Sequence, residues 1–170
     1  MILYVFRHGI AEDAPPGGDD RARRLTPRGR DKLVAAARGM RALGLTFDSV
    51  WTSPLVRAVE TAAIVTDATG GAPVPQRLPA LASGVAPAET LRALRAAAGD
   101  AHVLVVGHEP GLSGLVSLVL TGSAGAMTLA FKKGGLVALE LPEPRARAGA
   151  ATRGTLRWML TPRQLRRLGR

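Results

Sequence analysis

Two histidines of the sequence occupy equivalent places, each directly after a short apolar run. Arg7-His8-Gly9 follows the run at residues 2–6, and Gly107-His108-Glu109 follows the run at residues 102–106. Histidine serves as a nucleophile or proton carrier near neutral pH, and Gly9 lets the backbone turn sharply and approach a ligand closely. One such histidine would most simply be a hydrogen-bonded core residue. Two in the same context favour a shared chemical site.

Two arginines, like the two histidines, fall at the ends of predicted strands. Arg7 precedes His8, and Arg57 falls in the first turn of a helix whose start is predicted by Ser53-Pro54, with Ser53 as the N-cap. Guanidinium groups bind phosphate in a bidentate manner, and a helix N-terminus offers unpaired N–H groups. For any one of the 20 arginines a solvated surface charge is the simpler interpretation. Their positions at strand ends predict a receptor for a tetrahedral dianion.

A metal site is not expected from this pattern. His102 and His108 begin and follow one predicted strand, which separates them by roughly 20 Å, so they cannot share an ion. No carboxylates at ligand spacing join His8 and His108. Cysteine is absent, which excludes disulfides, thiolate metal sites and cysteine nucleophiles.

Alternating strands and helices must position these residues. Apolar runs predict strands at residues 2–6, 47–52, 102–106, 135–141 and 155–160, with a short one near 74–78. Helical periodicity and capping signals predict helices at 27–43, 54–69, 87–98, 112–120 and 163–168, and a loop at 10–25. This alternation predicts a three-layer α/β/α fold with a mostly parallel sheet of about six strands. The direction of the two late strands stays open. Ligands bind such sheets at the carboxyl ends of the strands, so the three polar clusters should share one rim.

Composition limits the class of protein. The 170 residues, 46% hydrophobic and 21% charged, predict one globular domain over residues 1–170. The net charge of +10 suggests anionic partners, although a codon bias toward arginine explains it equally well. No run reaches the ~18 apolar residues that cross a bilayer, and the N-terminus lacks the basic region of a signal peptide. We therefore expect a cytoplasmic protein with no membrane partner.

The chain resembles the histidine phosphatase (phosphoglycerate-mutase-like) superfamily. The resemblance rests on Arg7-His8-Gly9, Ser53-Pro54-x-x-Arg57-Ala58-x-Glu60-Thr61 and Gly107-His108-Glu109-Pro110. It extends to Leu25-Thr26-Pro27-x-Gly29 and to the last strand, so it covers most of the chain. The compact length and the segment Asp20-x-x-Arg23 look most like the SixA-type phosphohistidine phosphatases.

The resemblance implies a metal-independent phosphatase without an organic cofactor. Neutral His8 would attack phosphorus, and water would then hydrolyse the phosphohistidine intermediate. Arg7, Arg57 and a protonated His108 would hold the phosphoryl oxygens. The remaining implied substrate contacts are Arg23, Gly9 and Ser53.

One position departs from the pattern of the superfamily. Larger members carry an acidic proton donor in a Leu-x-Glu segment, and the matching stretch here is Leu78-Pro79-Ala80-Leu81, with Ala80 at the donor position. An alkoxide leaving group needs a strong general acid more than a nitrogen leaving group does, so the change favours phosphoramidates over sugar phosphates. Asp20 and Glu109 are candidate substitutes, although Glu109 equally fits a residue that stabilises a helix start.

Several functions are compatible with the sequence. The leading one is hydrolysis of phosphohistidine on a partner protein, with small phosphomonoesters or pyrophosphates as the alternative substrates. An arginine-rich nucleic-acid-binding module is the alternative of another class, supported by the charge and by the basic end Arg163, Arg166, Arg167 and Arg170. Only 4% of residues are aromatic and no long basic stripe exists, which disfavours nucleic acid. A catalytically silent phosphate-binding protein is disfavoured by the intact Arg7-His8-Gly9 and His108.

Overall fold

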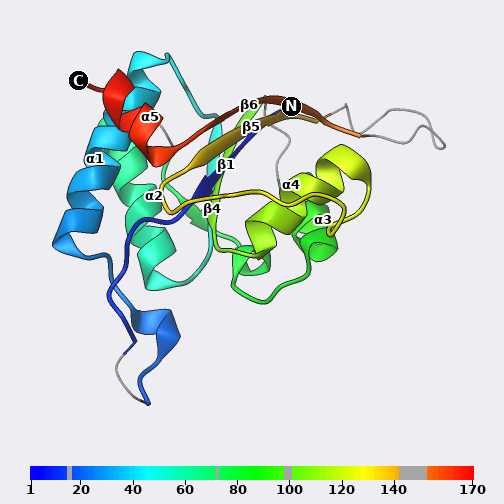
Figure 1. Cartoon of the computed structure of the whole chain (residues 1–170), viewed down its shortest axis with the longest axis horizontal. Coiled ribbons are helices and arrows are strands. Elements are labelled where there is room, and N and C mark those ends of the chain that lie inside the picture. The colour runs from blue at the N-terminus through cyan, green and yellow to red at the C-terminus, as the bar shows by residue number, and fades with distance from the viewer. Residues whose placement is uncertain (15–16, 72, 98–100, 142–152) are drawn as a thin grey trace.

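A computed structural model describes residues 1–14, 17–71, 73–97, 101–141 and 153–170 (Figure 1). The strands are β1 (Ile2–Arg7), β2 (Ser49–Thr52), β3 (Gln76–Arg77), β4 (His102–Gly107), β5 (Leu136–Glu140) and β6 (Thr155–Leu160). The helices are α1 (Pro27–Ala42), α2 (Val56–Thr69), α3 (Pro87–Ala97), α4 (Gly111–Thr121) and α5 (Pro162–Leu168), with 3-10 turns at Asp20–Ala22 and Pro79–Leu81. Each predicted element is present within a few residues of its expected ends, and residue 98 lies outside the described residues. None of the described helices is long and apolar enough to cross a membrane.

The described strands form one six-stranded sheet in the order β3-β2-β4-β1-β5-β6. Parallel pairing joins β1 to β4, β4 to β2, and β2 to β3. In contrast, β5 runs antiparallel to β1, and β6 runs antiparallel to β5. The predicted mostly parallel α/β sheet is confirmed, and the direction of the late strands is now defined. Because β5 is reversed, the residues just before it lie at the carboxyl end of β1.

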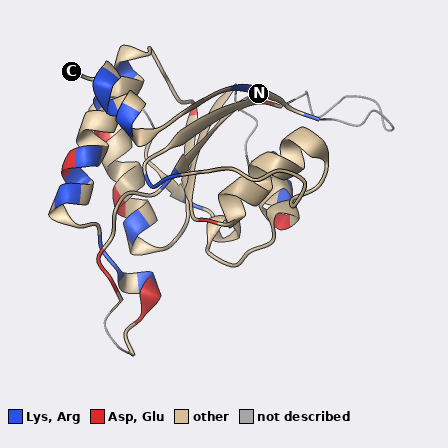
Figure 2. Ribbon diagram, in the orientation of Figure 1, with Lys and Arg blue, Asp and Glu red and all other residues tan. Residues whose placement is uncertain are grey.

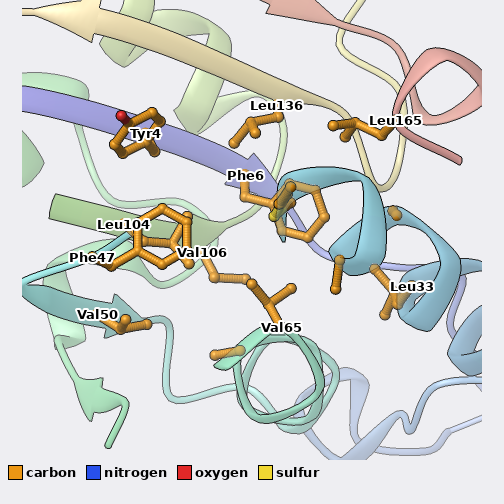
Figure 3. Close-up of a cluster of buried hydrophobic side chains, with 14 of the residues drawn as sticks. Tyr4, Phe6, Leu33, Phe47, Val50, Val65, Leu104, Val106, Leu136 and Leu165 are labelled. Atoms are coloured by element: carbon orange, nitrogen blue, oxygen red, sulfur yellow. The ribbon is translucent and has the colours of Figure 1, made fainter. Parts of the chain in front are cut away.

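Helices cover both faces of this sheet (Figure 1). Side chains alternate between the faces of a strand, so Tyr4 and Phe6 of β1 pack under α1, α2 and α5, while Leu3 and Val5 pack under α3 and α4. Figure 3 shows the first of these cores, in which Phe6 lies near Leu33 of α1. The central strands are therefore buried on both faces, which explains their nearly continuous apolar sequences.

The two helix starts flanking the site differ from each other. Thr26 caps α1 as predicted, because its Oγ1 accepts the N–H of Gly29 at 3.0 Å. The prediction that Ser53 caps α2 is wrong: the residue before the helix is Leu55, and no side chain caps it. The N–H of Ser53 donates to the carbonyl of Val106 at 2.9 Å, which keeps Ser53 attached to the sheet. Its Oγ accepts the N–H of Leu55 at 3.2 Å and lies at the end of β4.

Candidate active site

Parallel pairing of β1 and β4 brings the two predicted histidines together. Arg7 and Gly107 are partners in the strand register, and the N–H of His8 donates to the carbonyl of Gly107 at 3.2 Å. The ring centroids of His8 and His108 are 4.9 Å apart, and each residue is at most 5% exposed. The structure thus places both imidazoles at the rim that the strand ends predict.

The tautomer of His8 follows from its hydrogen bond. Its Nδ1 lies 2.7 Å from the carbonyl oxygen of Gly9. A carbonyl oxygen only accepts, so Nδ1 carries the proton and Nε2 keeps its lone pair. Burial lowers the pKa of His8 to about 3, and the positive charges of Arg57 and Arg7 and the nearby His108 act in the same direction. His8 is therefore neutral at pH 7, with Nε2 in the nucleophilic form.

Gly9 fixes the backbone beside this imidazole. A Cβ on Gly9 would lie 2.5 Å from Cδ1 and 2.9 Å from Cγ of Leu33, so a larger residue would force the Leu33 side chain to move. The N–H of Gly9 donates to Oγ1 of Thr61 at 3.1 Å, and that hydroxyl donates to the carbonyl of Arg57 at 2.6 Å. Thr61 thus joins the His8 loop to the helix that carries Arg57. Sequence reasoning gave Thr61 no role, although its four-residue spacing from Arg57 places both on one helix face.

One ring nitrogen of His108 lies close to a hydroxyl group, and the other is buried without a partner among the described residues. Its Nε2 is 2.7 Å from Oγ of Ser53, and its buried Nδ1 has no hydrogen-bond partner among the described residues. Burial lowers the pKa of His108 to about 4, with a further contribution from Arg57, while Asp20 opposes the shift. Without a bound anion, the protein's own groups therefore keep His108 neutral at pH 7. A phosphoryl dianion within hydrogen-bond distance would favour the charged form.

Arg57 and Arg23 both bind the carboxylate of Asp20. Nη1 of Arg57 donates to the Asp20 carbonyl at 2.7 Å and Nη2 donates to Oδ2 at 2.9 Å, while Nη1 of Arg23 donates to Oδ1 at 2.7 Å. The bonds from Arg23 and Arg57 lower the pKa of Asp20. An ionised carboxylate is a poor general acid at pH 7, which disfavours Asp20 as a proton donor. Arg57 itself is only 5% exposed, so this anion-binding guanidinium is directed into the site rather than solvent.

Glu60 holds the loop that carries Asp20 and Arg23. Its Oε2 accepts the N–H of Leu25 at 2.8 Å, and its Oε1 pairs with Arg24 at 3.1 Å and with Arg30 at 2.5 Å. The sequence motif contains Glu60, but sequence reasoning assigned it no role. The carboxylate ties the end of the predicted surface loop to α2, beside Arg57.

Arg7 and Glu109 complete the rim. Nη1 of Arg7 donates to the carbonyl of Phe131 at 2.5 Å, and its buried Nε has no partner in the part of the chain that the structure describes. Oε1 of Glu109 accepts the N–H of Ser113 at 3.0 Å, and its Oε2 accepts the Ser113 hydroxyl. Glu109 thus stabilises the start of α4. Of the two roles that the sequence allows for Glu109, this geometry fits the helix-start role rather than proton donation.

Ala80 lies beside His108, at the place where the resemblance expects an acidic donor. The two residues line a cavity of about 10 Å³, and the carbonyl of Ala80 accepts the hydroxyl of Thr90 at 2.6 Å. No carboxylate is therefore supplied from this position. Across the described ranges, no cluster of three or more histidine, aspartate or glutamate side chains is arranged to hold a metal ion.

The two lowered histidine pKa values predict that acid destabilises the protein. Each imidazole has a pKa near 6.5 when unfolded, so the unfolded chain binds more protons between about pH 6.5 and pH 4. The free energy of unfolding should decrease as the pH is lowered through this window. The His8→Asn variant should show a smaller decrease than the parent protein. Urea denaturation at several pH values measures both slopes. Parallel curves for the two proteins would show that His8 titrates normally.

Comparison with known proteins agrees with this geometry. The family model of the histidine phosphatase superfamily (branch 1) matches residues 3–82. An uncharacterized protein of Picosynechococcus sp. is 38% identical over 154 residues, which cover 87% of this chain and 90% of the relative. The structure of the protein histidine phosphatase SixA complexed with tungstate aligns with a TM-score of 0.82 and 27% identity, over 97% of this chain and 99% of the other.

The fold also occurs in an enzyme described with a different substrate. The alpha-ribazole phosphatase from Shigella flexneri aligns with a TM-score of 0.69 and 17% identity, over 95% of this chain and 97% of the other. Fold similarity at this identity leaves the substrate open. The matching family model, the SixA-like fold and the paired histidines at its strand ends show that the chain belongs to the histidine phosphatase superfamily.

Proposed function

We propose that this protein hydrolyses phosphohistidine on a partner protein through a phosphohistidine intermediate on His8. The main support for this proposal is the tautomer of His8, because the hydrogen bond to the Gly9 carbonyl keeps the proton on Nδ1 and leaves the Nε2 lone pair free for attack. The 27% identity to a protein histidine phosphatase over nearly the whole chain supports the same substrate class.

In the first step, Nε2 of His8 forms a bond to phosphorus while the phosphorus–nitrogen bond of the substrate breaks. The departing imidazole nitrogen takes a proton from solvent and leaves as neutral histidine. Arg7 and Arg57 stabilise the charge that spreads over the phosphoryl oxygens, and the unpartnered Nδ1 of His108 offers a further contact. In the second step, water attacks the phosphoenzyme and releases inorganic phosphate, which restores His8.

The surroundings of the leaving group favour a phosphoramidate. Ala80 supplies no acid beside His108, and Asp20 is ionised by its two arginine partners. Glu109 is engaged with Ser113 at the start of α4. An imidazole leaving group needs less help from a general acid than an alkoxide does. Phosphomonoester hydrolysis remains the second candidate, because an alpha-ribazole phosphatase shares the fold.

A direct comparison of substrates tests this proposal. The purified protein should release phosphate from a histidine-phosphorylated protein domain faster than from a sugar phosphate at equal concentration. The difference arises because only the alkoxide leaving group needs a strong acid. Phosphate release measured over time on both substrates gives the ratio of kcat/KM. Turnover of the sugar phosphate without action on phosphohistidine would establish the second candidate instead.

Nucleic-acid binding is the weaker alternative at this site. Arg57 is buried, so its guanidinium is not presented on an open surface that the backbone of a nucleic acid could follow. The residues that converge at the rim are those of a compact phosphoryl site, and two of them are neutral imidazoles.

A further inference from the structure

A second feature of the same rim is a pocket of about 720 Å³ that begins at Arg7 and extends between α1 and α5. We call it the basic pocket, because five cationic side chains beyond Arg7 line it: Lys32, Lys132, Lys133, Arg163 and Arg166. These include all three lysines of the chain. None of the five has a role in the reaction described above.

The fold brings these cations together from three separate segments. The reversed direction of β5 places the segment at 132–135 beside Arg7, where the N–H of Gly134 donates to the Arg7 carbonyl at 3.0 Å and the N–H of Arg7 donates to the Gly135 carbonyl at 3.2 Å. β6 ends at the same edge of the sheet and leads directly into α5. Figure 2 shows basic residues gathered on α1 and α5, on the layer away from α3 and α4. Arg7 therefore belongs both to the basic pocket and to the candidate active site around His8.

The charges of the basic pocket are not neutralised within the described part of the protein. None of its five cations forms an ion pair there, whereas Arg23, Arg24, Arg30 and Arg57 each pair with a carboxylate. Like charges that gather at one place repel each other, and an anion from outside the chain would relieve that repulsion. Lys132, Lys133 and Arg163 are exposed, so they are accessible to such an anion.

The pocket also has an apolar side. Ile10, Leu33, Ala36 and Pro162 line it together with the cations. A volume of this order suits a ligand larger than one phosphate ion, and the cations are spread over α1, the segment before β5, and α5. A stretch of polypeptide with acidic and apolar side chains matches both the spread of charge and the apolar lining.

We propose that the basic pocket binds acidic side chains that flank the phosphohistidine on the partner protein. This inference rests on the proposed function, and it extends that function from the reacting group to the sequence around it. Binding at the pocket would present the phosphorylated side chain to His8, because Arg7 borders both sites. Exposed charges act over a distance and are screened by salt, so the preference should weaken as ionic strength rises.

Charge reversal at the pocket provides the kinetic test. A phosphohistidine peptide flanked by glutamates should have a kcat/KM about tenfold above that of the same peptide with glutamines, mainly through KM. The double variant Lys132→Glu with Lys133→Glu should lose this preference and still hydrolyse free phosphohistidine at the parent rate. Arg92→Glu with Arg95→Glu, an equal change of charge at exposed positions of α3, should keep the preference. A preference that survives in the pocket variant, or is absent from the parent protein, would overturn the proposal.

A binding measurement separates this proposal from the proposed function. Fluorescence anisotropy of an unphosphorylated glutamate-rich peptide should show salt-sensitive binding to the parent protein and to the α3 variant, and weak binding to the pocket variant. If that pattern is found but no phosphohistidine is hydrolysed, the pocket assignment holds and the proposed function fails. If the peptide binds all three proteins alike, the pocket assignment is wrong whatever the substrate is. A single-stranded oligonucleotide that outcompetes the peptide would likewise overturn it in favour of nucleic acid.

Discussion

Replacing His8 by alanine should abolish both the phosphoenzyme and turnover. The parent protein, mixed with a radioactive phosphodonor and quenched, should carry a label that acid removes and alkali leaves in place, as expected for a phosphorus–nitrogen bond. His8→Ala removes the Nε2 lone pair that the Gly9 carbonyl orients, so no covalent intermediate can form. Loss of a nucleophile costs at least about a thousandfold in kcat.

His102→Ala is the matched control for this experiment. His102 opens β4, at the opposite end of the strand from His108, and its ring lies against Tyr4 rather than at the rim. This variant should label and turn over like the parent protein. A label that survives His8→Ala, or one that chemical stability assigns to an aspartate or serine, would defeat the mechanism.

Replacing Arg57 by alanine should lower kcat/KM by about 10² to 10³, the usual cost of removing one charge-stabilising donor from a buried site. Arg57 is 5% exposed. Its Nη1 donates to the backbone carbonyl of Asp20 and its Nη2 to the Asp20 carboxylate, so the guanidinium can bind two oxygens of a phosphoryl group at once. Arg57→Lys should recover only part of the loss, because an ammonium group is a point charge and cannot bind in a bidentate manner.

The control for Arg57 is Arg41→Ala, an exposed arginine in the last turn of α1. Steady-state kinetics on one phosphohistidine substrate should show no change for Arg41→Ala, and thermal denaturation should show that both variants are folded. Equal activity of Arg57→Ala and the parent protein would remove Arg57 from the site. An equal loss in both variants would point to a general effect of charge.

Much of the fold and the core of the site follow from local patterns in the sequence. Apolar runs and capping signals are local properties of the chain, so they predict β1, β4 and α1 within a few residues of their observed ends. The rule that parallel strands end at one edge then predicts that His8 and His108 meet, as they do. Ala80, the one position that departs from the pattern of the superfamily, lines the same small cavity as His108.

The chemical state of the site depends on contacts between distant residues. Ser53 lies two residues before the N-cap of α2, its N–H bonds to Val106 of β4, and its Oγ lies 2.7 Å from Nε2 of His108, 55 residues away. The sequence makes Asp20 a candidate proton donor, but Arg57, 37 residues away, binds its carboxylate and favours the ionised form. Helix caps and proton donors are predicted from residue types and their neighbours in the sequence. Those neighbours include neither His108, the partner of Ser53, nor Arg57, the partner of Asp20.

The elements, their order and the residue types at the strand ends can be predicted from the amino-acid sequence, because they depend on periodicity and turn chemistry over a few residues. The ring nitrogen of His8 that carries the proton, the lowered pKa of His108 and the direction of β5 are defined by the folded structure alone. The folded structure also decides that three separated segments enclose the basic pocket beside Arg7. Protonation and pocket shape are set by burial and by long-range pairing, which exist only once the chain has folded.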